Sequence, residues 1–246
     1  MKRIIYTLFI VLLIATIVIS SYFIYKELKQ NKKQEETFEE LIEIIENSNE
    51  NNKKEDEIEL RQLYEINNDL VGWLKIENTT IDYPVMKSKI KNYYLKKDFY
   101  KNYSSYGTPF LSEGCNISES DNLIIYGHHM KNRKMFGCLE DYKSQEFYEE
   151  NKIIEFYILN GDETIKTNYE IFAVFKTVVY TSNCFKYYNC IDFCNENEFN
   201  SFVDKVQDIS IYKTNIIPKY GDKFITLSTC EYSNKNGRLV VIARKV

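Results

Sequence analysis

The chain is poor in the residues that mark fibrous, disordered and nucleic-acid-binding proteins. Only three prolines and eight glycines occur in 246 residues, which excludes a collagen-like or Pro/Gly-rich chain. The formal net charge is −4, so there is no basic excess that would favour nucleic acid as a partner. Aromatic residues are abundant instead, with 21 tyrosines and 15 phenylalanines, and they supply enough apolar surface for one sizeable core.

The N-terminal segment is a long apolar run. Ile4–Tyr25 contains 22 residues without a charge and would span roughly 33 Å as a helix, enough to cross a bilayer. A cleavable signal peptide is the alternative, because Lys2 and Arg3 precede the run. However, the run is too long for one, and no A-x-A cleavage site follows it. Residues 1–26 are therefore predicted to be an uncleaved signal anchor, although basic residues at both ends leave its orientation open.

Residues 27–54 are predicted to form a stalk and polar linker, and residues 55–246 a folded domain. Within the stalk, Gln34–Asn47 carries apolar residues at helical spacing, which predicts a short amphipathic helix. Asn47–Asp56 is polar throughout and has nothing to bury, which is typical of a linker.

The domain beyond residue 55 is rich in strand-like segments. We expect strands at 72–76, 80–86, 108–111, 123–126, 152–159, 164–180, 224–230 and 239–243, and helices at 57–66, 135–142, 144–150 and 196–207. Asn160-Gly161, between two of the strands, is the strongest hairpin signal in the chain. Many strands with few helices predict a mainly β fold, a closed β-barrel of about eight strands with N-terminal and peripheral helices.

The C-terminal hairpin places a thiol beside a cation. Phe224–Cys230 alternates and is rich in β-branched residues, Leu239–Ala243 is a second apolar strand, and a turn-rich connection joins them. If the hairpin is symmetric about Asn234, Cys230 lies opposite Arg238, about 5 Å away at Cα. A fixed cation stabilises a thiolate. The alternative is a buried structural cysteine and an arginine that faces solvent.

Histidine is scarce, and both histidines of the chain lie together. His128 and His129 follow the apolar segment Leu123–Tyr126 and the strand-breaking Gly127. A cysteine and a histidine from remote segments are the usual arrangement of a thiol nucleophile and its acid/base partner. On an extended backbone His129 points away from His128, so a two-histidine metal site is not expected.

These segments together resemble the sortase family. The motif T-L-S-T-C at Thr226–Cys230, followed by Arg238 after a short loop and preceded far upstream by Y-G-H at Tyr126–His128, is similar to the sortase signature. The E-Y after the cysteine, the M-K and M-F after the histidine, and Y-L-x-x-D-F at Tyr94–Phe99 resemble the class B branch. The resemblance covers the domain beyond residue 55.

The resemblance implies a membrane-anchored cysteine transpeptidase of Gram-positive bacteria. Its partners would be secreted proteins that bear a C-terminal sorting signal, and a peptidoglycan amine that accepts the thioacyl group. Cys230 would be the nucleophile, His128 the acid and base, and Arg238 the group that binds substrate carbonyls or the oxyanion. We expect a single-pass protein in the cell membrane with its catalytic domain outside, and neither a cofactor, a metal nor nucleic acid.

Three further residues are expected to bind substrate. Strand alternation puts Ser228 on the same side as Cys230, and the resemblance assigns Ser228 and Glu231 to substrate holding. Leu95 matches a substrate-contacting leucine of the family, but the asparagine expected four residues before it is a lysine here. The segment 181–195 corresponds to the variable loop over the family's substrate groove.

Other interpretations concern the remaining cysteines and the class of protein. Cys184, Cys190 and Cys194 could bind zinc, but their spacing matches no strong zinc template, so structural thiols are expected, and disulfide pairing is left open.

An inactive or differently specialised membrane-anchored binding module would keep the barrel without needing the Cys/His/Arg trio. An L,D-transpeptidase-like wall enzyme is disfavoured because its S-H-G-C signature does not surround Cys230. A papain-like hydrolase would place its cysteine before the histidine.

Overall fold

The computed structural model describes residues 2–52, 58–161, 163–181 and 184–246. The chain divides into two compact units, Met1–Glu40 and Leu41–Val246, and helix α1 (Lys2–Asn52) contributes to both. Over the part of α1 up to Asn47, the helix is long and apolar enough to cross a membrane, with a mean hydropathy of 2.6 in its most apolar window. A signal sequence passes the same test of length and composition.

Helix α1 is continuous where the sequence predicted two separate elements. The linker expected at Asn47–Asp56 is helical as far as Asn52, and the rest of it lies outside the described residues. The physical reason is that no glycine or proline occurs before Gly72, so nothing in this stretch interrupts the helix. In the second unit, Leu41 and Ile45 lie four residues apart on one helix face and are buried.

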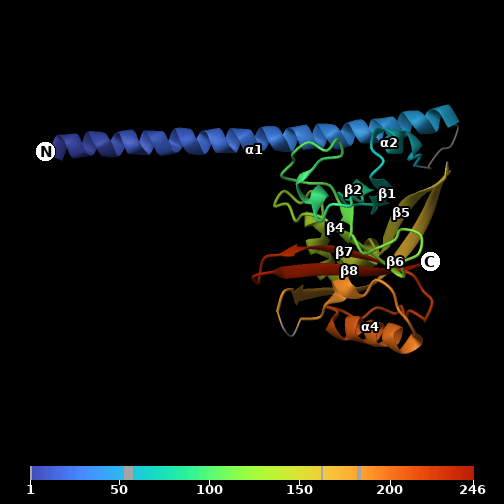
Figure 1. Cartoon of the computed structure of the whole chain (residues 1–246). Coiled ribbons are helices and arrows are strands. Elements are labelled where there is room, and N and C mark those ends of the chain that lie inside the picture. Colours follow the sequence, from blue (N-terminus) through green and yellow to red (C-terminus); the bar gives the residue numbers. More distant parts are fainter. Residues whose placement is uncertain (1, 53–57, 162, 182–183) are drawn as a thin grey trace. The chain divides into compact units, whose positions relative to one another are not determined.

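The second unit contains a closed eight-stranded barrel, as predicted, with the strand order β1-β2-β3-β4-β7-β8-β6-β5 (Figure 1). The strands are β1 (Leu70–Lys75), β2 (Asp82–Met86), β3 (Phe110–Leu111), β4 (Asn122–Tyr126), β5 (Ile153–Asn160), β6 (Glu163–Val178), β7 (Phe224–Glu231) and β8 (Gly237–Lys245). The pairs β2–β3 and β4–β7 are parallel, and the other neighbours are antiparallel.

Further helices precede the first strand or connect later strands. They are α2 (Arg61–Ile66), α3 (Gln145–Glu150), α4 (Glu196–Ile209) and three 3₁₀ segments, η1 (Tyr93–Lys96), η2 (Gly137–Lys143) and η3 (Tyr187–Asn189). The helix expected at 135–142 is thus a 3₁₀ segment. 3₁₀ geometry is common in short connectors.

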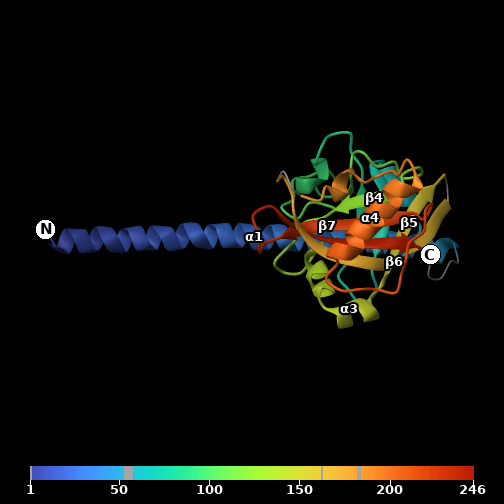
Figure 2. The same ribbon diagram turned by 90° about the horizontal axis from the view of Figure 1, so that it is seen from below.

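Helix α4 covers the outer face of the barrel beside β7. It begins after Asn195, whose side chain accepts a hydrogen bond from Glu198 N and so caps the first turn. Phe199 of α4 stacks on Phe224 of β7, with ring centroids 5.3 Å apart, inside a cluster that also contains Phe175 of β6. Figure 2 shows α4 lying across this part of the sheet. The helix therefore anchors the preceding segment, residues 184–195, over the same face of β7.

Candidate active site

The parallel pairing of β4 and β7 brings the predicted histidine and cysteine to one edge of the barrel. Tyr126 of β4 is the register partner of Ser228 of β7, and His128 and Cys230 each follow two residues later. Beyond the paired residues, the Gly127 amide donates to Ser228 O at 3.2 Å. Two segments that are remote in sequence therefore end side by side, in the part of the barrel where Figure 1 shows β4 and β7 adjacent.

The hairpin register predicted from sequence is confirmed. Cys230 of β7 is the direct cross-strand partner of Arg238 of β8, and Glu231 pairs with Gly237. Gly237 is required here because a Cβ at this position would lie 2.3 Å from Glu231 O. Cys230, Arg238 and His128 are all half-buried, so each is held by the fold and is still accessible from outside.

Arg238 has an unneutralised charge in the described part of the chain. Its Nη1 donates to the neighbouring carbonyl of Gly237 at 2.8 Å, and no ion pair among the described residues includes it. A guanidinium has five N–H donors, so several remain for another acceptor. A cation without a carboxylate partner, beside a thiol, can stabilise negative charge that develops on a substrate.

His128 is fixed in one tautomer by a backbone contact. Its Nε2 lies 2.7 Å from Leu95 O, and because a carbonyl can only accept, Nε2 carries the proton in the neutral ring. Nδ1 is then the atom that can gain and lose a proton. Burial lowers the pKa of His128 below its ordinary value, the Leu95 hydrogen bond opposes this, and the Lys96 cation lowers it further. The neutral imidazole is therefore favoured.

Leu95 was predicted at the site as a substrate contact, and the structure gives it a second relation to the chemistry. It lies in η1, is half-buried, and presents its carbonyl to His128. Sequence reasoning missed this contact because no residue type is needed for a backbone acceptor.

Ser228 lies on the Cys230 face of β7, as strand alternation predicts, but it is covered. It is 1% exposed, and its Oγ is 2.7 Å from the hydroxyl of Tyr187 in η3. Burial raises the pKa of Tyr187 to about 12, whereas the Ser228 hydrogen bond and the Arg238 cation act in the opposite direction. Tyr187 is a site residue that sequence reasoning missed, since the 181–195 loop has no motif of its own.

Glu231 is on the opposite face of β7 from Cys230 because successive side chains alternate. Its buried carboxylate is 3.0 Å from Lys176 Nζ and 3.3 Å from Lys143 Nζ, and it accepts from the amide of Ser233 at 3.1 Å. Burial by itself would raise the pKa of Glu231, but the hydrogen bonds from Ser233, Lys176 and Lys143 lower it to about 2. The carboxylate ties the end of β7 to β6 and η2, and its expected contact with substrate stays a prediction.

The remaining cysteines differ from Cys230 in their surroundings. All six cysteines of the chain lie within the described residues and are free thiols. Burial raises the pKa of Cys115 and Cys138, and it raises that of Cys190 to about 11. The pKa of Cys184 is lowered, and the largest cause is its hydrogen bond with the main chain of Thr181. Within the described residues, no three His, Cys, Asp or Glu side chains gather so as to hold a metal ion.

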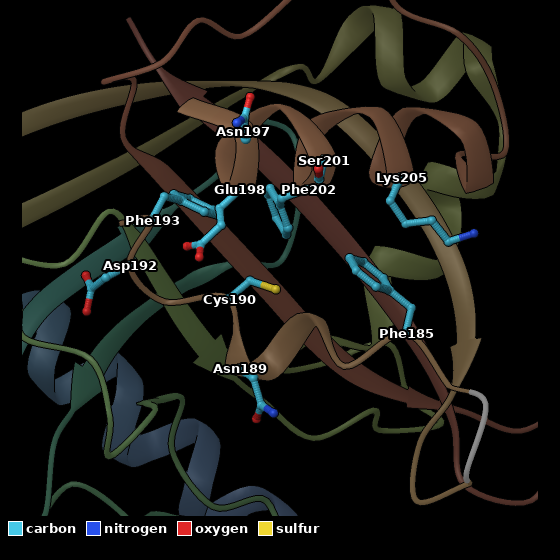
Figure 3. A pocket seen from close by; sticks show the side chains of 10 residues that line it. All are labelled: Phe185, Asn189, Cys190, Asp192, Phe193, Asn197, Glu198, Ser201, Phe202 and Lys205. Carbon is cyan, nitrogen blue, oxygen red and sulfur yellow. The ribbon is translucent and has the colours of Figure 1, made fainter. Parts of the chain in front are cut away.

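A cavity of about 530 Å³ lies between α4 and the segment before it (Figure 3). The phenyl rings of Phe185, Phe193 and Phe202 and the thiol of Cys190 line it, with polar side chains of α4 at the rim. Among the described residues that line it, none is a predicted catalytic residue. The cavity therefore adjoins the loop that carries Tyr187 and is separate from the Cys230 edge.

Comparison with known proteins agrees with the fold. The sortase domain family model matches residues 74–246, and the chain belongs to the sortase family of cysteine transpeptidases. Within that family it falls in the class B branch. It is 32% identical to sortase B of Staphylococcus aureus over 99% of this chain and 97% of that protein. It is 37% identical to sortase B of Listeria monocytogenes over 76% and 74% of the two chains.

Solved structures show the same relationship. The Staphylococcus aureus sortase B–substrate complex superposes with a TM-score of 0.77 at 31% identity, covering 88% of this chain and 98% of that one. Clostridium perfringens sortase B superposes with a TM-score of 0.67 at 29% identity, covering 76% of this chain and 98% of that one. Proteins of this family are associated with the cell surface and join sorting-signal substrates to cell-wall amines.

Proposed function

We propose that Cys230, His128 and Arg238 carry out the transpeptidation in this chain. The observation that supports this most strongly is the combined register of three strands. The antiparallel β7–β8 hairpin pairs Cys230 with Arg238, and the parallel β4–β7 pair ends with His128 at the same edge. The hairpin thus pairs the nucleophile with the oxyanion donor, and the pairing of β4 with β7 adds the acid/base from a remote segment.

The first step is acylation. Transfer of the Cys230 thiol proton to Nδ1 of the neutral His128 gives a thiolate and an imidazolium, and the thiolate attacks the scissile carbonyl of the sorting signal, forming a C–S bond and an oxyanion. The C–N bond then breaks, and the leaving amine takes the proton from Nδ1 of the His128 imidazolium. The products are a thioester on Cys230, a free C-terminal peptide and a neutral His128 whose Nε2–H still donates to Leu95 O.

The second step transfers the acyl group to an amine of the cell wall. The amine attacks the thioester carbonyl, and the neutral Nδ1 of His128 accepts the proton that the nitrogen loses. The C–S bond breaks, and the thiolate and imidazolium are restored together. In both steps the guanidinium of Arg238 hydrogen-bonds the oxyanion or an adjacent substrate carbonyl.

Substrate holding is assigned to Leu95, Ser228 and Glu231, in agreement with the sequence prediction. Leu95 supports this because η1 lies against His128. Ser228 supports it because it lies on the same face of β7 as Cys230 and its hydroxyl is held by that of Tyr187. Glu231 contributes to substrate holding because its ion pairs with Lys176 and Lys143 fix the end of β7. The Staphylococcus aureus relative has been solved with a substrate, and a sortase B has been solved with triglycine. We assign this chain a sorting-signal donor and a wall-peptide amine.

The chain is assigned to the cell membrane as a single-pass protein, with the catalytic unit outside. The support is the apolar part of α1 together with the association of the family with the cell surface. Protease added to intact, wall-stripped cells should degrade or release the catalytic unit. Complete protection in sealed cells would place the unit in the cytosol and contradict the assignment.

The test of the catalytic assignment uses the full chain in detergent micelles with a library of sorting-signal peptides, with and without a wall-derived amine. We expect a thioacyl adduct on the Cys230 peptide, and amide product only when the amine is present. Cys230→Ala should abolish both while the thermal midpoint stays unchanged, and the exposed-cysteine control Cys194→Ala should remain active. An active Cys230→Ala variant would contradict the assignment, and an inactive wild-type chain would favour a binding module.

A further inference from the structure

His129 occupies the place of a backbone donor where the parallel ladder of β4 and β7 ends. The Gly127 amide makes the last backbone bond of this ladder, to Ser228 O. In a parallel ladder the next bond, two residues on, would join the amide of His129 to Cys230 O. The imidazole of His129 fills this place, because its Nδ1 lies 2.9 Å from that carbonyl oxygen. Since the carbonyl can only accept, Nδ1 carries the proton.

Tyr232 makes a second bond in the opposite direction. Its hydroxyl donates to His129 O at 3.1 Å, and the two rings meet edge to face, with centroids 5.0 Å apart at 67°. Edge-to-face contact is a favourable arrangement for aromatic rings. The residue after the acid/base histidine is therefore hydrogen-bonded to the main-chain carbonyl of Cys230 and to the side chain of Tyr232, two positions beyond it.

The backbone that carries both histidines is held from its other side. The Phe136 amide donates to His128 O at 2.9 Å, and His129 forms an isolated antiparallel bridge with Met135. The ring of Phe136 also packs where a Cβ on Gly127 would lie, 2.6 Å from it. With its main chain fixed in this way, His129 can transmit the position of this backbone to Cys230.

We propose that His129 is a positioning residue that holds the main chain of Cys230 in register with His128. This proposal rests on the proposed roles of Cys230 and His128. Without the Nδ1–H bond, Cys230 O loses its partner on the β4 side, and the Cys230–Glu231 peptide is held only by its pairing with β8. A shift of this peptide displaces Sγ from the approach that the substrate carbonyl requires, and displacements of about 1 Å are costly for reaction rates.

Two substitutions at this position separate the donor from the ring. His129→Phe keeps a ring against Tyr232 and removes the donor. His129→Asn removes the ring and keeps an N–H at the place of Nδ1. We expect His129→Phe to lower kcat for thioester formation about tenfold at nearly constant KM, as loss of one neutral hydrogen bond would. His129→Asn should restore most of the rate, and Tyr103→Phe, an exposed tyrosine elsewhere, should leave it unchanged.

A spectroscopic readout that needs no substrate accompanies the kinetics. In the full chain labelled with ¹⁵N-histidine in lipid, the two neutral imidazoles should be opposite tautomers, Nε2–H for His128 and Nδ1–H for His129. This measurement stands even if the wild-type chain fails to transpeptidate, so failure of the proposed function is told apart from failure of this inference.

Three results would overturn the inference. The first is a wild-type kcat in the His129→Phe variant. The second is an equal loss of kcat in the His129→Asn and His129→Phe variants. The third is an Nε2–H tautomer at His129 in the NMR measurement. If His129→Phe lowers the thermal midpoint, the rates are compared at a temperature where both proteins are folded. A normal rate there overturns the positioning role, and a slow rate supports it.

Discussion

Cys230 and Arg238 are direct cross-strand partners in the β7–β8 hairpin. Cross-strand partners have Cα atoms about 4.5–5.5 Å apart, so the guanidinium stays beside the thiol whether or not substrate is present. Arg238 has no carboxylate partner among the described ion pairs, and this leaves its planar fork available. The shape of the group, as well as its charge, is therefore expected to matter.

We predict that Arg238→Lys lowers kcat/KM at least about 10²-fold. A lysine keeps the charge but cannot bridge two oxygens with a planar fork, and loss of one oxyanion donor typically costs about 10²–10³ in rate. The thermal midpoint should barely move, since surface changes at a strand end are usually within about 0.5 kcal/mol. The control is Arg244→Lys, at the far end of the same strand. Near-normal turnover of the Arg238 variant would leave only an electrostatic role.

Glu231 should make the stability of the protein depend on pH in the acid range. Its folded pKa of about 2 is below the ordinary value of 4.5. Its contribution to the free energy of unfolding is therefore fully present above about pH 4.5 and is lost as the pH falls toward 2. Urea unfolding of Glu231→Gln should show a weaker dependence over this window than wild type. Glu140→Gln, which loses another partner of Lys143, should change the dependence less; equal dependence in both variants would contradict the prediction.

The pKa of His128 should rise when the Lys96 cation is removed. Burial lowers the pKa most, and Lys96 lowers it further, so Lys96→Gln should shift the titration of the His128 imidazole to higher pH. The titration is measured by NMR on ¹⁵N-histidine, and Lys91→Gln, an exposed lysine of the same segment, is the control. The same shift in both variants would show that Lys96 has no specific effect on His128. A shift to lower pH would contradict the predicted direction.

The hydroxyls of Tyr187 and Ser228 should be energetically coupled. Both side chains are buried and their oxygens are 2.7 Å apart, so removing one hydroxyl leaves the other without a partner, at a cost of about 1–3 kcal/mol. Tyr187→Phe and Ser228→Ala should each lower stability, and the double variant should lose less than the sum by about 0.5–1.5 kcal/mol. Strict additivity in urea unfolding would show that the hydroxyls act independently.

Local patterns in the sequence determined the main parts of this protein. The uncharged length of Ile4–Tyr25 predicted a membrane-spanning helix, and alternation with turn residues predicted the β7–β8 hairpin. The register of that hairpin, and with it the Cys230–Arg238 pair, followed from the position of the turn alone, because a short connection leaves little freedom of pairing. The scarcity of histidine singled out His128 for the same site.

Only the tertiary structure decided which groups support these residues. The Leu95 carbonyl on His128, the Tyr187 hydroxyl on Ser228 and the imidazole of His129 on Cys230 O are contacts between segments far apart in the chain. Such contacts depend on the closure of the barrel and on where each strand ends. Backbone acceptors and loop side chains follow no sequence period, so their partners are fixed only when the strands have been assembled.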